Sequence, residues 1–167
     1  MESVLKLIQS NTKNGVFSII ADEKDNAIVS GFGDVEMLRN KLPDQYKAYE
    51  IEFVPKHPYQ HNIDDYFSGN LTALKSIKIV TKGSNFQKSV YRELLKTRPG
   101  TTVSYKKIAQ LIGSPNAYRA IGSACRSNRL PLLVPCHRIV KHDGKIGNYI
   151  YGIEIKKSLL SHEHGDC

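Results

Sequence analysis

The most constraining feature of this sequence is an apolar run at residues 130–134, which ends at Pro135, Cys136, His137 and Arg138. Because apolar side chains leave water on folding, this run must be buried and the rest of the chain must fold around it. Free cysteine is among the most buried residue types, so Cys136 fits an ordinary core position. A thiol beside an imidazole at the polar end of a buried segment is also typical of a nucleophile in a pocket. The segment alone leaves both interpretations open.

Basic residues outnumber acidic ones in this chain of 167 residues, with 24 lysines and arginines against 16 aspartates and glutamates. The formal net charge of +8 favours an anionic partner, either a nucleic acid or an anionic membrane surface. No stretch approaches the roughly 18 to 20 apolar residues of a membrane span, and residues 1–15 lack a signal-peptide pattern. We therefore expect an intracellular protein without a membrane segment, cytoplasmic or, in a eukaryote, nuclear.

The sequence has three cysteines, Cys125, Cys136 and Cys167. Their odd number and the absence of CxxC spacing disfavour a disulfide framework and a thiolate zinc site, and they indicate a reducing compartment. Two histidines, His57 and His61, are four residues apart, but the proline between them argues against a regular helix. We therefore expect these histidines to be solvated in a loop, and we expect no metal.

Sheet signals dominate the first half of the chain. Residues 16–21 and 27–32 are rich in β-formers and flank a polar turn, which predicts a hairpin. Beyond it we expect a helix, a strand, a short helix and an extended link, at residues 34–42, 46–54, 63–68 and 77–80. Helical signals then take over, so we expect an N-terminal α/β unit over residues 1–80 and a second unit over residues 81–167.

The second half is patterned as short helices. Residues that cap or end helices divide it, namely Ser84, Pro99-Gly100, Ser104, Gly113 and Ser114-Pro115. The first predicted helix has apolar residues at four-residue spacing from Phe86 to Leu94, the second spans 105–111, and the third spans 115–127. The tight, glycine-containing turn between the second and third helices is typical of a helix-turn-helix.

The third predicted helix has faces of different chemistry. We expect an inward face of Tyr118, Ile121 and Cys125, a smooth stripe of Ala117, Ala120 and Ala124, and a basic face of Arg119, Gly122 and Arg126. Small residues beside arginines would allow the helix backbone to approach a phosphate-lined groove. A helix that packs its alanines against another helix and leaves its arginines solvated explains this pattern equally well. The net charge and the preceding helix favour DNA.

Four motifs occur in the order and spacing of one known family: FQxxVY at 86–91, PGTTVSY at 99–105, RAIG at 119–122 and PCHR at 135–138. By these motifs the chain resembles the O6-alkylguanine-DNA alkyltransferases, also called methylated-DNA–protein-cysteine methyltransferases. The match runs through residues 84–163, and the first sixty residues carry little of the family's signature. Four ordered motifs are much more specific than any one of them.

The resemblance implies an α/β protein of two lobes. The N-terminal lobe would be a ribonuclease H-like sheet with a helix, and the C-terminal lobe would be helical and carry the helix-turn-helix. The implied activity is DNA repair: an alkyl group moves once and irreversibly from the O6 atom of guanine to a cysteine. The guanine must first be flipped out of the duplex, because a stacked base hides the reacting carbon. The implied partner is double-stranded DNA bound through its minor groove by a monomer, and no cofactor is needed.

The resemblance also assigns roles to individual residues. Those matching the reaction centre are Cys136 (alkyl acceptor), His137 (base), Glu163, Asn128, Tyr105 and Lys156. Those matching DNA contacts are Arg119, Tyr105, Ala120, Gly122, Ser123 and Arg126, with Arg119 replacing the flipped nucleotide. Those matching the substrate pocket are Val134, Pro135, Tyr149 and Ile150. Because neighbours in extended backbone point to opposite sides, we expect a water between Cys136 and His137. Lys156 and Glu163 are seven residues apart, so one helix face can present both to the same site.

Two departures from the family pattern affect these expectations. Ile150 and Tyr151 replace the small residues that often follow the pocket tyrosine, so we expect a narrower pocket that handles bulky adducts poorly. Some members have an N-terminal zinc site built with cysteines, and no cysteine precedes residue 125 here. The alternatives are a non-catalytic sensor of alkylated guanine, a helix-turn-helix regulator, and a cysteine hydrolase or redox enzyme. The sensor is disfavoured because such relatives lack the acceptor cysteine.

Overall fold

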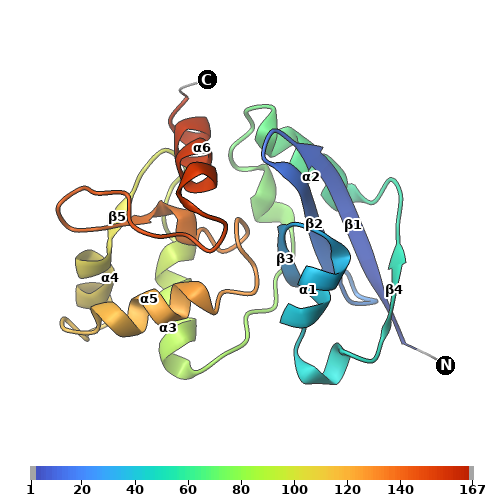
Figure 1. Cartoon of the computed structure of the whole chain (residues 1–167), viewed down its shortest axis with the longest axis horizontal. Helices are drawn as coiled ribbons and strands as arrows, with labels where there is room; N and C mark the ends of the chain where they lie inside the picture. The colour runs from blue at the N-terminus through green and yellow to red at the C-terminus, as the bar shows by residue number, and fades with distance from the viewer. Residues whose placement is uncertain (1–2, 166–167) are drawn as a thin grey trace. The chain divides into compact units, whose positions relative to one another are not determined.

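The computed structural model describes residues 3–165, so Cys167 lies outside the described residues. The chain has an α/β fold and divides into two compact units, residues 1–80 and 81–167 (Figure 1). The described residues contain six α-helices and six β-strands, with the larger sheet in the first unit. The second unit is mainly helical.

The sheet of the first unit has four strands: β1 (Val4–Thr12), β2 (Gly15–Ala21), β3 (Ala27–Phe32) and β4 (Glu50–Phe53). Their order is β3-β2-β1-β4, and only the β1–β4 pair is parallel. The predicted hairpin is confirmed as β2 and β3. Strand β1 has no counterpart among the predicted elements, although Val4 to Ile8 are apolar except for Lys6 and are rich in β-forming residues. That short apolar run is the signal that identifies it.

The turn between β2 and β3 is closed by side chains. The Asp22 carboxylate accepts hydrogen bonds from the backbone N–H groups of Lys24 and Asn26, at 2.9 Å each. Asp25 then adopts a left-handed conformation with φ of 63°, which aspartate tolerates better than most residues. Its carboxylate lies 2.6 Å from Lys6 Nζ and 3.0 Å from His57 Nε2, so the turn is tied to β1 and to the residue before α2.

The helices of the first unit begin where capping chemistry places them. Asp34 caps α1 (Val35–Lys41), which agrees with the predicted helix over 34–42. Helix α2 (Pro58–Phe67) starts five residues earlier than predicted. Pro58 occupies its first turn, where a backbone N–H would have no partner within the helix, so the missing N–H of proline costs nothing there. The expectation of a solvated loop for His57 is therefore wrong: its side chain is buried and caps α2 through Tyr59 N. Strand β4 is shorter than predicted because a 3₁₀-helix occupies Asp44–Tyr46. A second 3₁₀-helix spans Ala73–Ser76, and Ile79 beyond it bridges to Ala27.

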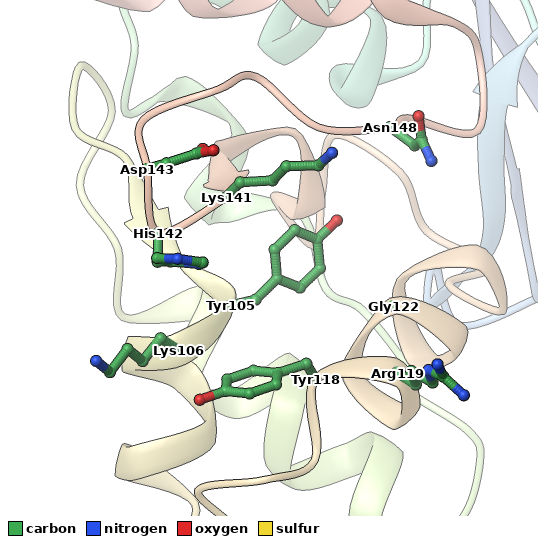
Figure 2. A pocket seen from close by; sticks show the side chains of 9 residues that line it. All are labelled: Tyr105, Lys106, Tyr118, Arg119, Gly122, Lys141, His142, Asp143 and Asn148. Atoms are coloured by element: carbon green, nitrogen blue, oxygen red, sulfur yellow. The ribbon is translucent and has the colours of Figure 1, made fainter.

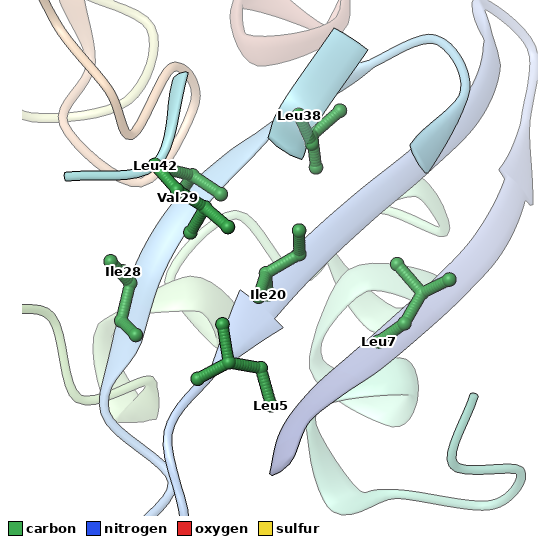
Figure 3. Packing of buried hydrophobic residues seen from close by; sticks show 7 residues of the cluster. All are labelled: Leu5, Leu7, Ile20, Ile28, Val29, Leu38 and Leu42. Carbon is green, nitrogen blue, oxygen red and sulfur yellow. The ribbon is translucent and has the colours of Figure 1, made fainter. Parts of the chain in front are cut away.

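Helices α1 and α2 cover opposite faces of the sheet. Successive residues of a regular strand point to opposite sides, and one buried cluster contains Leu5, Leu7, Ile20, Ile28, Val29, Leu38 and Leu42 (Figure 3). The adjacent Ile28 and Val29 both belong to it because the β2–β3 register shifts at Ile20 and Ala21. Leu38 comes from α1, which therefore packs on the sheet face of this cluster. On the other face the Ser10 hydroxyl donates to Asp64 of α2. Truncating a buried leucine such as Leu38 to alanine costs about 2–5 kcal/mol in comparable cores.

The second unit contains helices α3 (Asn85–Leu95), α4 (Tyr105–Leu111), α5 (Tyr118–Arg126) and α6 (Ile153–His164). The short strands β5 (Val103–Ser104) and β6 (Ile139–Val140) pair in parallel, and a 3₁₀-helix spans Cys136–Arg138. Ser84 and Gln87 form a capping box on α3, and Ser104 caps α4 through Lys107 N. The predicted caps of these two helices are confirmed.

Helix α5 begins three residues later than predicted. Residues 114–117 instead form a turn in which Ala117 N donates to Ser114 O at 3.0 Å. Pro115 takes the second position of this turn, where its fixed φ is favourable. The buried Tyr91 hydroxyl of α3 donates to Ala124 O of α5 at 2.7 Å, and burial raises the pKa of Tyr91 to about 12. This neutral hydrogen bond fixes the two helices to each other.

Candidate active site and nucleic-acid interface

The cysteine of the PCHR motif sits at the end of a tightly wound loop. Leu132 has a left-handed backbone with φ of 73°, which is uncommon outside glycine. Pro135 has φ of −81° and ψ of 62°, and Cys136 N donates to Val134 O at 2.8 Å, which together define an inverse γ-turn. The next three residues form the 3₁₀-helix. The expected extended backbone at 136–137 is therefore wrong, and side-chain alternation does not place His137 opposite Cys136.

Asn128 holds this loop from inside. Its buried Nδ2 donates to Val134 O at 3.0 Å and lies 3.3 Å from Cys136 Sγ, and its Oδ1 accepts from Leu130 N at 3.0 Å. One side chain thus connects the start of the loop, its end and the sulfur atom. A hydrogen bond toward sulfur stabilises the thiolate form over the thiol.

Cys136 is 3% exposed and lies in the wall of a pocket of about 420 Å³. The pocket is lined by Tyr105, Gly122, Cys125, Arg126, Cys136, Asn148, Tyr149 and Ile150. Of the predicted pocket residues, Tyr149 and Ile150 line it, whereas Val134 and Pro135 do not. Both of the latter are buried and shape the site through their backbone, which accepts from Asn128 and closes the γ-turn. Cys125 also lines the pocket, and burial raises the pKa of its thiol.

His137, the residue after the pocket cysteine, forms a buried pair with Glu163. His137 Nε2 lies 3.0 Å from Glu163 Oε2, and the imidazole has no exposed surface. Burial lowers the pKa of His137 more than the neighbouring carboxylate raises it, so the neutral, proton-accepting imidazole is favoured. Its other nitrogen, Nδ1, is buried and has no hydrogen-bond partner among the described residues. This nitrogen is the atom left available for a proton.

Arg138 completes this cluster, although the sequence predicts no role for it. Its Nε and Nη2 donate to the two oxygens of Glu163, at 2.8 Å each, and its Nη1 donates to Thr97 O at 3.0 Å. Burial alone would raise the pKa of Glu163, but the hydrogen bonds from Arg138 and His137 outweigh it and hold that pKa well below its usual range. The carboxylate therefore stays charged. The position of Arg138 inside the PCHR motif is the signal that could have identified it.

Lys156 is buried on α6 and donates to Ile139 O at 2.6 Å and Asn148 O at 3.1 Å. Burial lowers its pKa to about 8. Gly147, with φ of 74°, adjoins both Lys156 and Tyr105: a Cβ at this glycine would lie 3.6 Å from Lys156 Nζ and 3.7 Å from the Tyr105 ring. Lys156 and Glu163 thus reach the same chain segment, residues 137–148, from one helix.

The exposed side of α5 carries most of the predicted DNA contacts. Its exposed residues include Arg119, Ala120, Ser123 and Arg126, and Gly122 is half-buried among them. The predicted small-residue stripe is divided, because Ala124 is buried against α3 while Ala120 faces solvent. The inward placement of Tyr118 is wrong. Its ring is 43% exposed, because Tyr118 is the first residue of the helix and projects into a second pocket rather than the core.

This second pocket, here called the α4–α5 pocket, has a volume of about 570 Å³. It is lined by Tyr105, Lys106, Tyr118, Arg119, Gly122, Lys141, His142, Asp143 and Asn148 (Figure 2). Tyr105, Gly122 and Asn148 also line the cysteine pocket, so the two pockets adjoin. Over residues 3–165, no group of three His, Cys, Asp or Glu side chains is placed to hold a metal ion. Over the same residues, every helix is too short or too polar to cross a membrane.

Comparisons with known proteins place this chain among similar proteins of one kind. The family described as "6-O-methylguanine DNA methyltransferase, DNA binding domain" matches residues 85–165. A methylated-DNA–protein-cysteine methyltransferase of Saccharomyces cerevisiae is 35% identical over 94% of this chain and 85% of its own length. One from Methanosarcina barkeri is 41% identical over 62% of this chain and 65% of its own length. A crystal structure of Mycobacterium tuberculosis OGT in complex with DNA has a TM-score of 0.81 and 26% identity, covering 97% of this chain and 94% of that one.

This α/β fold, with Cys136 in a pocket beside the basic face of α5, is that of a DNA-binding protein with a candidate nucleophilic cysteine. The chain belongs to the methylated-DNA–protein-cysteine methyltransferase family.

Proposed function

We propose that this protein repairs DNA by transferring the alkyl group of O6-alkylguanine to Cys136 Sγ, once per molecule. The observation that carries this proposal is the position of Cys136 in the wall of a pocket that also includes Gly122 and Arg126 of the basic helix. Next to Cys136 in the chain, the buried cluster of His137, Arg138 and Glu163 would supply a base held in one orientation. The names of the family relatives point to the same reaction.

In the proposed step, the sulfur attacks the alkyl carbon, the carbon–oxygen bond breaks, and a thioether forms. The thiol proton passes through a water to His137 Nδ1, while Glu163 and Arg138 keep Nε2 on the far side. The electron pair of the broken bond stays on the guanine, which takes a proton from the Tyr105 hydroxyl. Burial raises the pKa of Tyr105, so this phenol is protonated at neutral pH. The Lys156 ammonium stabilises the negative charge that develops at the Tyr105 oxygen.

The proposed DNA contact places α5 in the minor groove, with the target nucleotide flipped into the cysteine pocket. Arg119 would occupy the space left in the stack, and Ala120, Gly122 and Ser123 would allow close approach of the helix backbone. Exposure of these residues on one side of α5 supports this arrangement. Flipping costs a few kcal/mol, which a methylated and weakly paired guanine reduces.

We also propose that the first unit is a ribonuclease H-like lobe and that the protein acts as a monomer. The sheet order β3-β2-β1-β4, in which only β1 and β4 are parallel, supports the ribonuclease H-like topology. A sensor that binds the lesion without transfer is not favoured, because Cys136 is present with its base cluster. All the proposed site residues lie in the second unit, so we propose no catalytic role for the first unit.

The test is the stoichiometry of repair. The protein is incubated with excess duplex containing O6-methylguanine, and restored guanine is measured over time. We expect a plateau at one guanine per protein, the same plateau for Cys125→Ser, and none for Cys136→Ser. Cys125→Ser is a matched control because Cys125 lines the same pocket. Continued turnover, or an equal plateau for Cys136→Ser, would contradict the proposal.

A further inference from the structure

The α4–α5 pocket is chemically different from the cysteine pocket. Cys136 does not line it, and it contains three cationic side chains, Lys106, Arg119 and Lys141. Its one carboxylate, Asp143, lies 3.8 Å from Lys145, so that negative charge already faces a cation outside the pocket. Over residues 3–165, no carboxylate lies within ion-pair distance of the three pocket cations. The pocket therefore favours an anion.

Two tyrosine rings give the pocket flat apolar walls. In Figure 2, Tyr105 stands in the middle of the pocket and Tyr118 lies beneath it. The Tyr118 ring extends toward the side on which Lys106 lies, whereas Arg119 extends the opposite way. Tyr118 and Arg119, consecutive residues of α5, can therefore contact different parts of a ligand. An exposed aromatic ring beside a lysine fits a ligand that has both a negative charge and a flat or apolar part.

We infer that the α4–α5 pocket binds the nucleotide next to the alkylated guanine in the same DNA strand. Lys106, on the side toward which the Tyr118 ring extends, contacts its phosphodiester, and the Tyr118 ring packs against its sugar or base. This inference rests on the proposed function, because the strand that enters the cysteine pocket must pass its neighbour beside Tyr105, which both pockets share. Tyr118 is therefore a positioning residue for the flipped nucleotide.

The phosphate contact is tested by the salt dependence of DNA binding. Lys106→Gln is compared with Lys107→Gln, its neighbour on α4, because Lys107 does not line the pocket and both changes remove one charge. Duplex binding is measured at several salt concentrations. We expect Lys106→Gln to reduce the slope of log K against log salt by about one relative to the wild type. Equal slopes for the two variants would overturn the phosphate assignment.

The ring contact is tested by comparing methyl transfer from duplex DNA with methyl transfer from free O6-methylguanine base. We expect Tyr118→Ala to weaken duplex binding and slow methyl transfer from duplex by about tenfold, as loss of an aromatic contact to a nucleotide does. Tyr118→Phe keeps the ring and should behave like the wild type. Phe53→Ala, which truncates an exposed aromatic residue of the first unit, is the matched control.

Free O6-methylguanine base has no neighbouring nucleotide, so Tyr118→Ala should react with it at the wild-type rate. Equal duplex rates for Tyr118→Ala and Phe53→Ala, or an equal loss of rate with the free base, would overturn the role of Tyr118. If the wild type itself takes no methyl group from duplex DNA, the proposed function fails instead. The two failures are therefore distinguishable.

Discussion

At the scale of single residues, the proposed alkyl transfer depends on a proton acceptor, His137, kept neutral inside the protein. Burial favours neutral His137, and Glu163 orients it without becoming neutral itself, because Arg138 donates two hydrogen bonds to that carboxylate. Arg138 also opposes a positive charge on the imidazole. The arginine therefore acts on the base through the carboxylate that both contact.

This arrangement predicts the effect of Arg138→Met. Without the guanidinium, the pKa of His137 rises, because a cation that opposed its protonation is gone. His137 then becomes the neutral base only at higher pH, so the acidic limb of the rate profile for methyl transfer moves to higher pH. The stability of the fold falls by about 3–5 kcal/mol, as when one partner of a buried ion pair is removed.

The measurement is the single-turnover rate of methyl transfer between pH 5 and 9, with folding checked by circular dichroism. Arg129→Met is the control, because Arg129 is exposed and lies outside the cluster. An unchanged profile for folded Arg138→Met would show that the arginine has no influence on the base.

At the scale of secondary-structure elements, the turn at Pro99-Gly100 packs its backbone closely against α6. This glycine has φ of 85°, and a Cβ added there would lie 3.0 Å from the backbone oxygen of Glu163. A backbone atom cannot rotate away as a side chain can. The turn at Pro99-Gly100 therefore positions the helix that carries Glu163.

The matched pair Gly100→Ala and Gly113→Ala tests this packing. Both glycines have positive φ, so each alanine pays the backbone strain of about 1–2 kcal/mol, but Gly113 has open space at its Cβ position. We expect Gly100→Ala to lose at least about 1 kcal/mol more in urea unfolding and to slow methyl transfer. Equal losses for the two variants would contradict the packing argument.

Capping chemistry explains which elements the sequence predicts well. Ser84, Ser104 and Asp34 mark helix starts because their side chains bond the backbone locally. The 3₁₀-helix at Cys136 follows a γ-turn at Pro135, and Tyr118 is exposed because residues 114–117 form a turn before α5. Helix and strand periodicity reveals neither turn. The sequence motifs identify residues typical of the family but do not say which of them touch. The contact of Arg138 with Glu163, 25 residues away, is therefore visible only in the folded structure.

At the scale of the whole molecule, buried ionisable groups make stability depend on pH. Lys156 has a pKa of about 8 when folded, below the ordinary lysine value of 10.5, because it is buried. Between these two values the unfolded chain binds more protons than the folded one. Stability therefore rises with pH across this window as far as Lys156 is concerned. Cys125 acts in the opposite direction, because burial raises its pKa.

Comparison with Lys156→Met isolates the lysine contribution. We expect the free energy of unfolding of the wild type, relative to this variant, to increase between about pH 8 and 10.5. Urea unfolding at pH 7.5, 9 and 10.5 measures it, with Lys157→Met, an exposed neighbour, as control. If the difference in unfolding free energy between wild type and Lys156→Met stays constant with pH, the pKa of Lys156 is the same in the folded and unfolded chain, which contradicts the prediction.

In the proposed reaction, only the sulfur atom of Cys136 accepts the alkyl group. Peptide mass spectrometry after reaction with duplex DNA containing O6-methylguanine covers both pocket cysteines, Cys125 and Cys136, in one measurement. We expect a single methyl group, on the peptide that contains Cys136, and an unmodified Cys125. Methylation of Cys125, or of neither cysteine, would contradict the proposal.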